Sequence, residues 1–138
     1  MSPAPDTTTA RTRLKPPGPA TGFVDGAWWP RSEDLAAELP PLLEDVHDRG
    51  DVARVAYHLD DWTAAPRRLA PGRVRLEGFR TTAPHSVTLV GPAGLRLVLL
   101  VIPSSTPEGT AEAAMTAAAA PDDRRSPADL LDGAETAP

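Results

Sequence analysis

Apolar and polar residues recur with two different periods along the middle of this chain. Over residues 35–46 the apolar positions return every three or four residues, which predicts an amphipathic helix that begins after an N-cap at Ser32. Pro40 and Pro41 fall inside this pattern, and a proline in a helix interior costs about 3 kcal/mol. We therefore expect a kink or break at Leu39, with Pro41 opening a second short helix.

Beyond residue 50 the period changes to two, which is typical of half-buried strands. Gly91-Pro92-Ala93-Gly94 separates two such stretches and predicts a hairpin loop. The continuous apolar run over 98–102 predicts a central strand that is covered on both faces. The predicted strands are residues 53–59, 67–70, 74–80, 87–90 and 95–102.

Short extended segments precede this region, and an Ala-rich helix follows it. Leu14 leads into the proline-rich residues 16–19, which predicts an edge strand that runs into a rigid turn. Residues 22–26 form a second extended segment. Thr106-Pro107 reads as a cap followed by a first-turn proline, so we expect a helix over 108–119. Because its apolar face is mostly Ala, its docking should be weak.

These elements predict an α+β fold. It has a small, mostly antiparallel sheet, one kinked helical segment and a C-terminal Ala-rich helix, arranged as a two-layer sandwich or a small open barrel. Residues 13–120 form a single domain in this interpretation. Residues 1–12, rich in Pro, Ala and Thr, and the acidic residues 121–138 are expected to be disordered tails.

Composition narrows the class of protein. A chain of 138 residues leaves room for one domain, and the absence of Cys excludes disulfides and thiol nucleophiles. No apolar run approaches the length that a membrane span needs, and residues 1–13 lack the apolar core of a secretory signal. We therefore expect a cytoplasmic protein that does not enter a membrane.

Charge is unevenly distributed. Residues 33–61 carry a net charge of −7 and residues 62–96 a net charge of +5, so we expect the two stretches to pair within the fold. The overall charge of −5 argues against a dedicated duplex-DNA binder and makes nucleic acid an unlikely partner. One alternative remains open, which is single-strand binding by an arginine-rich sheet face. Its candidates are Arg67, Arg68, Arg73, Arg75, Arg80 and Arg96.

The densest group of candidate binding residues precedes the predicted helix: Asp25, Trp28, Trp29 and Arg31. Adjacent indoles in an extended segment point to opposite faces, so we expect one in the core and one near the surface. An exposed indole beside a helix N-terminus suits a planar or anionic ligand, or anchors a partner. Arg80 is the best distant candidate to join them. The alternative is that both indoles pack against the helix.

A second candidate site would combine His58, His85 and Asp25 for acid–base or metal chemistry. The three histidines show no metal-ligand spacing, and neither a nucleophile elbow nor a phosphate-binding loop is present. No cofactor is expected. Nothing in the sequence is arranged for catalysis, so we expect a non-catalytic protein.

Several strings resemble a family of short actinobacterial proteins that is defined as a domain of unknown function. They are Leu14-Lys15-Pro16, Gly22 to Ser32 with its Asp-Gly-Ala-Trp-Trp-Pro-Arg-Ser string, Leu35 to Pro40, Val55 to Trp62 and Gly78-Phe79-Arg80. The resemblance covers about residues 13–102. It implies a bacterial cytoplasmic protein and assigns no activity, ligand or site residue. Our hypothesis is a small accessory protein that binds a protein partner or a small anionic ligand through the Trp28/Trp29 segment.

Overall fold

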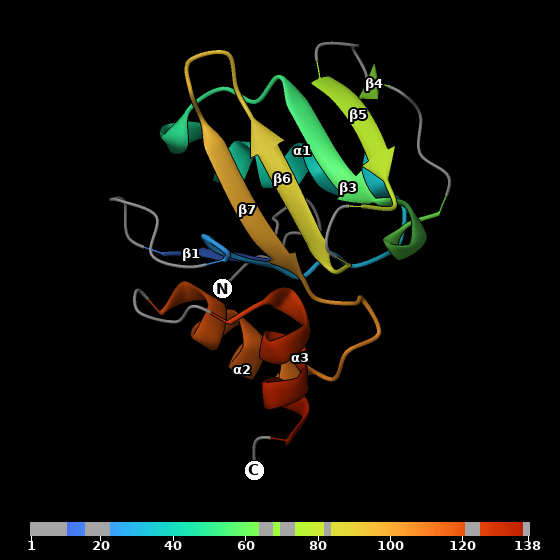
Figure 1. Ribbon diagram of the computed structural model, residues 1–138, viewed down its shortest axis with the longest axis vertical. Helices are drawn as coiled ribbons and strands as arrows, with labels where there is room; N and C mark the ends of the chain where they lie inside the picture. The colour runs from blue at the N-terminus through green and yellow to red at the C-terminus, as the bar shows by residue number, and fades with distance from the viewer. Residues whose placement is uncertain are drawn as a thin grey trace, which may run out of the picture.

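The computed structural model describes residues 11–15, 23–63, 68–69, 74–81, 84–120 and 125–136. The predicted turn at 16–19 lies outside these residues, as do residues 1–10. Within them, seven strands form one sheet in the order β1-β2-β7-β6-β3-β5-β4 (Figure 1). The strands are β1 (Thr12–Leu14), β2 (Gly26–Trp28), β3 (Arg54–His58), β4 (Arg68–Leu69), β5 (Val74–Phe79), β6 (Ser86–Val90) and β7 (Arg96–Val101).

The predicted α+β class and mostly antiparallel sheet are confirmed. Two of the strand pairs, β2–β7 and β3–β5, are parallel, and the other pairs are antiparallel. In the part of the chain that the structure describes, the edge strands β1 and β4 each pair with one neighbour only, so the sheet stays open and does not close into a barrel. The helices are α1 (Leu35–Asp45), α2 (Glu108–Ala119) and α3 (Pro127–Thr136), with short 3-10 turns η1 (His47–Arg49) and η2 (Leu59–Asp61).

The pairing directions determine where the loops gather. Because β6 is antiparallel to both β3 and β7, strands β2, β7, β3 and β5 all run in the same direction. The segments that follow these four strands therefore leave the sheet at one edge, which we call the carboxyl edge.

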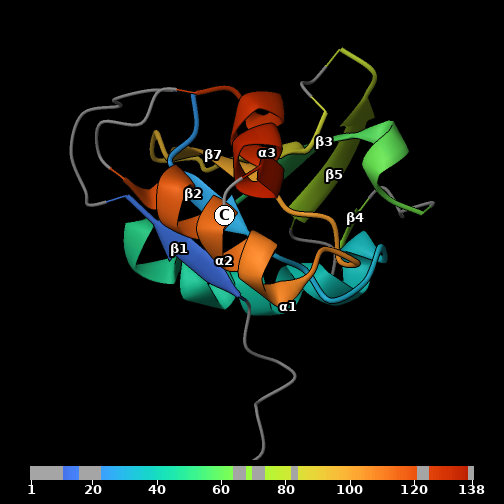
Figure 2. The same ribbon diagram turned by 90° about the horizontal axis from the view of Figure 1, so that it is seen from below.

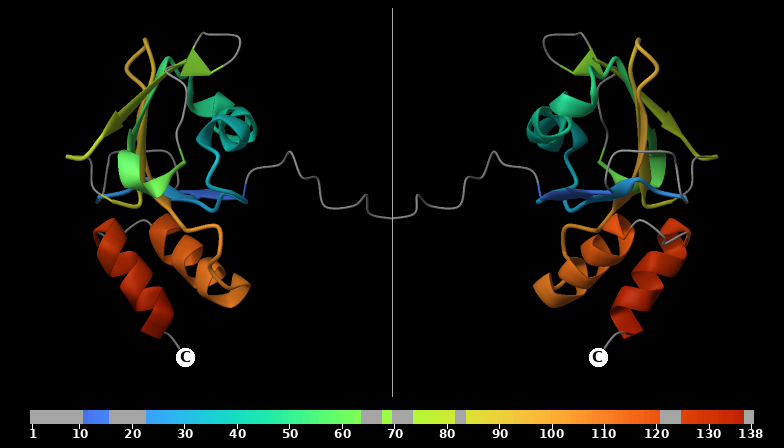
Figure 3. Two further views of the ribbon diagram at one scale, coloured as in Figure 1. Left: turned by 90° about the vertical axis from the view of Figure 1, so that its right-hand side faces the viewer. Right: turned by 90° about the vertical axis from the view of Figure 1, so that its left-hand side faces the viewer.

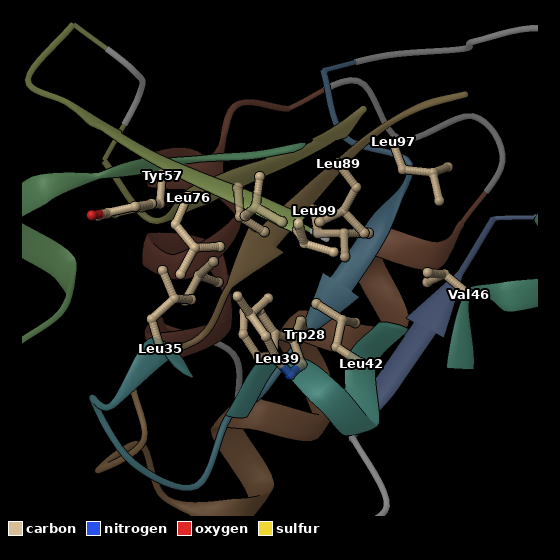
Figure 4. Close-up of a cluster of buried hydrophobic side chains, with 14 of the residues drawn as sticks. Trp28, Leu35, Leu39, Leu42, Val46, Tyr57, Leu76, Leu89, Leu97 and Leu99 are labelled. Carbon is tan, nitrogen blue, oxygen red and sulfur yellow. The ribbon is translucent and has the colours of Figure 1, made fainter. Parts of the chain in front are cut away.

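One core lies between α1 and the sheet (Figure 4). The alternation that predicted β3 and β5 is confirmed, since Val55, Tyr57, Val74 and Leu76 all point into this core. The indole of Trp28 stacks on that of Trp62, with 5.2 Å between ring centroids. This aromatic pair fills the end of the core nearest the carboxyl edge.

The helix α1 differs from the prediction in two respects. It is capped by Asp34, whose side chain accepts a hydrogen bond from the Ala37 N–H, and not by Ser32. It also runs through Pro40 and Pro41 without a break. Pro40 is exposed and Pro41 is only half-buried, so the lost hydrogen bonds lie away from the core. Burial of the opposite face outweighs them, and that face contains Leu35, Leu39, Leu42 and Val46.

A second core lies on the other face of β2 and β7, beneath α2 and α3 (Figure 2). Because β7 lies between the two cores, the prediction of a central strand covered on both faces is confirmed. The predicted helix over 108–119 is also confirmed as α2. Its N-cap is Pro107, however, and no side chain caps it, so Thr106 does not have the expected role. Arg13 of β1 bonds to Glu112 and Thr116, which ties α2 to the sheet edge.

The expected acidic tail at 121–138 contains α3, so the structure corrects that boundary. The Ser126 hydroxyl accepts a hydrogen bond from the Asp129 N–H and begins the helix at Pro127. Leu130 is 1% exposed in the second core. The physical reason is that α2 presents mostly Ala, and a leucine from α3 fills the space that these small side chains leave.

None of the helices in the described ranges has the length and apolarity that a membrane crossing requires.

Candidate functional site

The carboxyl edge brings together loops that are far apart in the sequence. Residues 29–34 follow β2, residues 59–63 follow β3, and residues 102–107 follow β7. His85 lies at the same edge, directly before β6. Two cavities open here, and His85 lines both of them.

His85 has an unusual backbone conformation. Its φ is 61°, and no other non-glycine residue in the described ranges has a positive φ. The conformation is held by Asp61, whose Oδ2 accepts a hydrogen bond of 2.7 Å from the His85 N–H. A strained backbone of this kind persists only where its surroundings enforce it, and such residues concentrate at functional sites.

The same carboxylate faces the imidazole. Asp61 Oδ1 lies 3.8 Å from His85 Nδ1, which makes an ion pair whenever the imidazole is protonated. The Asp61 side chain is only 8% exposed, whereas that of His85 is 40% exposed. Asp61 is therefore the inner, fixed member of the pair and His85 the member that contacts solvent or a ligand.

The larger cavity has a volume of about 290 Å³ and lies between the end of β7 and helices α2 and α3. This volume is near the lower end of the range for small-molecule sites. The lining combines hydrogen-bonding side chains with apolar ones. They are His85, Pro103, Thr106, Thr110, Ala114, Ala128, Leu131 and Asp132.

The smaller cavity, of about 110 Å³, lies beside the aromatic pair. Asp61, His85, Trp62 and Ser104 all line it. Within the described residues, Trp62 Nε1 is a buried donor with no hydrogen-bond partner. Buried polar atoms of this kind are rare in proteins and mark places where a bound group can be accommodated.

The structure places the predicted tryptophans on opposite faces of the sheet, which confirms the alternation. Both are buried, however, at 1% exposure for Trp28 and 7% for Trp29. The expected surface indole is thus corrected, because α2 and α3 cover the face to which Trp29 points. Trp29 Nε1 donates to the Pro103 carbonyl at 3.2 Å. Asp25 is occupied as well, since its Oδ2 accepts the Val98 N–H at 2.8 Å.

The two candidate arginines lie in different places. Arg31 is exposed at the entrance to α1, where its backbone N–H donates to Glu38 Oε1. Burial and the positive charge of Arg31 lower the pKa of Arg11, so the two guanidinium groups are neighbours. Arg80 pairs with Asp60 at 3.7 Å. Asp60 lines the smaller cavity with Pro30, so Arg80 lies near that cavity and is not part of the Trp28/Trp29 segment.

The second predicted constellation does not assemble. His58 Nδ1 accepts a hydrogen bond from the Asp60 N–H and caps η2, while His85 faces Asp61 and Asp25 is bonded to Val98. Among the residues that the structure describes, no three His, Cys, Asp or Glu side chains are grouped to hold a metal.

Sequence reasoning named His85 but did not identify Asp61 as its partner. The two residues are 24 positions apart. No local pattern connects them, and the residue type at position 85 carries no sign of a positive φ. The pairing of η2 with the segment before β6 is visible only in the folded chain.

A sequence model of a protein family matches residues 11–118, which is well over half of the chain. The chain belongs to DUF5994, a family of unknown function. The suspected membership of a family of unknown function is thereby confirmed. The DUF5994 match takes in the whole sheet, α1 and all but the last residue of α2, and it ends before α3. No curated protein and no solved structure is significantly similar to this DUF5994 chain.

Proposed function

We propose that this protein is a non-catalytic binding protein that holds a small ligand in the larger cavity at the carboxyl edge. One observation carries the proposal. His85 is kept in a strained backbone conformation by the buried carboxylate of Asp61, and it lines the cavity between β7, α2 and α3. Residues held in such strained conformations cluster at binding and catalytic sites, which supports a functional role for this side chain.

The lining indicates the chemistry of the ligand. An imidazole, two threonine hydroxyls and a carboxylate surround a floor of apolar side chains. The imidazole of His85 and the hydroxyls of Thr106 and Thr110 can each donate or accept a hydrogen bond, so the cavity suits a compact ligand with hydroxyl, amine or carboxylate groups. The cavity volume of about 290 Å³ limits the ligand to a small metabolite.

Partner binding by the Trp28/Trp29 segment stays a prediction. Because both indoles are buried, such a partner would contact Arg31 and the polar atoms around it, not an indole face.

Catalysis is the second candidate function. An imidazole oriented by a carboxylate is the arrangement of a general base. Ser104 lines the smaller cavity beside this pair, but within the described residues no hydrogen bond joins its hydroxyl to His85. Because no hydrogen bond within the described part of the chain yet joins this hydroxyl to the base, ligand binding is the function that the geometry favours over catalysis.

The test is a thermal-shift and native mass-spectrometry screen of the whole chain against small metabolites that carry hydroxyl, amine or carboxylate groups. A ligand present at 100 times its Kd raises the free energy of unfolding by about 2.7 kcal/mol. Thr110→Leu fills the cavity and should remove that shift. Thr88→Leu makes the same change in β6, outside both cavity linings, and should retain it. Equal binding to both variants would show that the cavity is not the site.

A further inference from the structure

One face of the sheet is only partly covered. Helix α1 lies against one face, while α2 and α3 lie against the β2–β7 end of the other (Figure 3). In the views of Figure 1 and Figure 3, no described helix covers this second face over β6, β3 and β5. We call this region the open face.

Arginines form a row across the open face. Arg68 of β4 pairs in register with Arg75 of β5, and Arg75 pairs with Arg54 of β3. Arg54 is opposite Val90 of β6, which is in turn opposite Arg96 of β7. Residues in register point to the same side of a sheet, so the four arginines share one face, and all four are exposed. Two further candidates, Arg67 and Arg73, lie outside the described residues.

This row is unfavourable for the fold itself. Like charges directly opposite one another on neighbouring strands destabilise a sheet. Glu77 relieves part of the repulsion, because its carboxylate lies 3.3 Å from Arg54 Nε. In the described part of the chain, Arg75 and Arg96 form no ion pair. Arg75 and Arg96 therefore present positive charge to solvent on this face, and departures from local stability rules concentrate at functional sites.

An exposed aromatic side chain shares the face. Phe79 alternates with Arg75 and Glu77 along β5 and is 42% exposed. It lies four residues from Arg75, which is about 13 Å along the strand. The arginine row spans four strand spacings, or about 19 Å. The open face thus presents a line of positive charge with an aromatic ring to one side of it.

We propose that the open face binds single-stranded nucleic acid, with the arginine row on the phosphates and Phe79 stacked on a base. Guanidinium groups match phosphate oxygens in pairs, and base stacking on aromatic side chains is tolerant of sequence. A duplex would hide its bases from Phe79. An acidic peptide supplies negative charge but no bases to stack on that ring. This site is separate from the cavity at His85, so its test is independent of the ligand screen.

The test is fluorescence anisotropy with a labelled oligothymidylate of about 12 nucleotides, within the usual range of single-strand sites. The affinity of the full chain should fall steeply as salt rises from about 50 to 200 mM. Each phosphate contact contributes about 0.7 to the slope of the logarithm of the affinity against the logarithm of the salt concentration. The double variant R75E/R96E should lose at least tenfold in affinity, and its slope should fall by about 1.4. F79A should weaken binding and leave the slope unchanged.

The matched control is R31E/R125E, which makes the same change in charge at two exposed arginines outside the row. It should bind within about twofold of the wild-type chain at equal salt. Circular dichroism verifies that each variant is folded. Equal losses from both double variants, or no binding by the wild-type chain at low salt, would overturn the proposal. A third result would also overturn it: polyglutamate binds as tightly as the oligothymidylate, and F79A does not change that affinity. This result would indicate that the face binds an acidic peptide instead.

Discussion

The guanidinium group of Arg11 lies over the indole of Trp29, and the distance from Arg11 Cζ to the ring centroid is 3.6 Å. Its Nε and NH2 groups donate to the carbonyls of Trp29 and Pro30, at 2.9 and 3.0 Å. The Trp29 N–H returns a hydrogen bond to the Arg11 carbonyl. Arg11 thus fastens the start of β1 to the end of β2, although composition placed it in a disordered tail.

We expect Arg11→Ala to lower the free energy of unfolding by about 1–3 kcal/mol, because a cation–π contact and two hydrogen bonds are lost together. Arg11→Lys should recover only part of this, since an ammonium group cannot make the paired contacts. Urea denaturation measures the free energy of unfolding of both variants. Arg96→Ala, at an exposed arginine of β7, is the control and should change stability by less than about 0.5 kcal/mol. Full recovery by lysine would contradict this account.

The strain at His85 predicts opposite effects of two substitutions. Asn adopts a positive φ more readily than His, so His85→Asn should leave the unfolding free energy unchanged or raise it by up to about 1 kcal/mol. Asp61→Ala removes the acceptor of the His85 N–H and should lower the free energy of unfolding by about 1–3 kcal/mol. Chemical denaturation of both variants checks the pair. A marked loss in His85→Asn would mean that the imidazole itself stabilises the fold.

Two glycines should respond to alanine in opposite ways. A Cβ at Gly26 would collide with the Arg13 carbonyl oxygen across the β1–β2 pair, so Gly26→Ala should lower the free energy of unfolding by about 1–3 kcal/mol. A Cβ at Gly109 in α2 meets nothing within 4 Å. Gly109→Ala should therefore stabilise the chain by about 0.5–1 kcal/mol through its higher helix propensity. Thermal melts of the two variants should shift in opposite directions.

Asp45 should make stability depend on pH. Burial raises the pKa of Asp45 above its ordinary value of 3.8. The neighbouring Thr12 hydroxyl opposes this rise, and the negative charge of Glu44 adds to it. The folded chain then binds more protons than the unfolded chain, so stability falls as pH rises from about 3.8 through the raised value. Asp45→Asn removes this dependence. As pH rises through this range, the free energy of unfolding of the variant should therefore increase relative to that of the wild-type chain. The comparison is made by denaturation at several pH values.

The control for that experiment is Asp51→Asn, at a carboxylate whose side chain is 84% exposed. It should follow the wild-type profile at every pH. A parallel shift of both variants would assign the effect to net charge and not to Asp45.

The elements with a strong local pattern could be predicted from the sequence. The alternation at Val55 and Tyr57, the hairpin at 91–94 and the apolar run of β7 all depend on neighbouring residues, and each is present in the structure. The continuity of α1 through Pro40 could not be predicted, because it depends on the packing of the opposite helix face against the sheet. Helix α3 has a local signal, the Ser126-Pro127 start followed by leucines, which the acidic composition concealed.

The candidate site was less predictable than the fold. Its central contact joins Asp61 to His85, and the geometry depends on a backbone angle that residue type does not encode. The tryptophans had a clear local signal, but their burial depends on α2 and α3, which lie about 80 residues or more further along the chain. Local pattern therefore identified the unusual residues without showing which of them face solvent.

The parallel pairing of β2 with β7 imposes an order on assembly during synthesis. Asp25 and Val98, which bind each other at the start of this pair, are 73 positions apart. Strand β2 leaves the ribosome early, yet its partner β7 is complete only after Val101 has been added. The strands β3 to β7 follow one another in the sequence and can associate first, because nearby segments close smaller loops. The N-terminal strands then add to the edge of a sheet that is already formed.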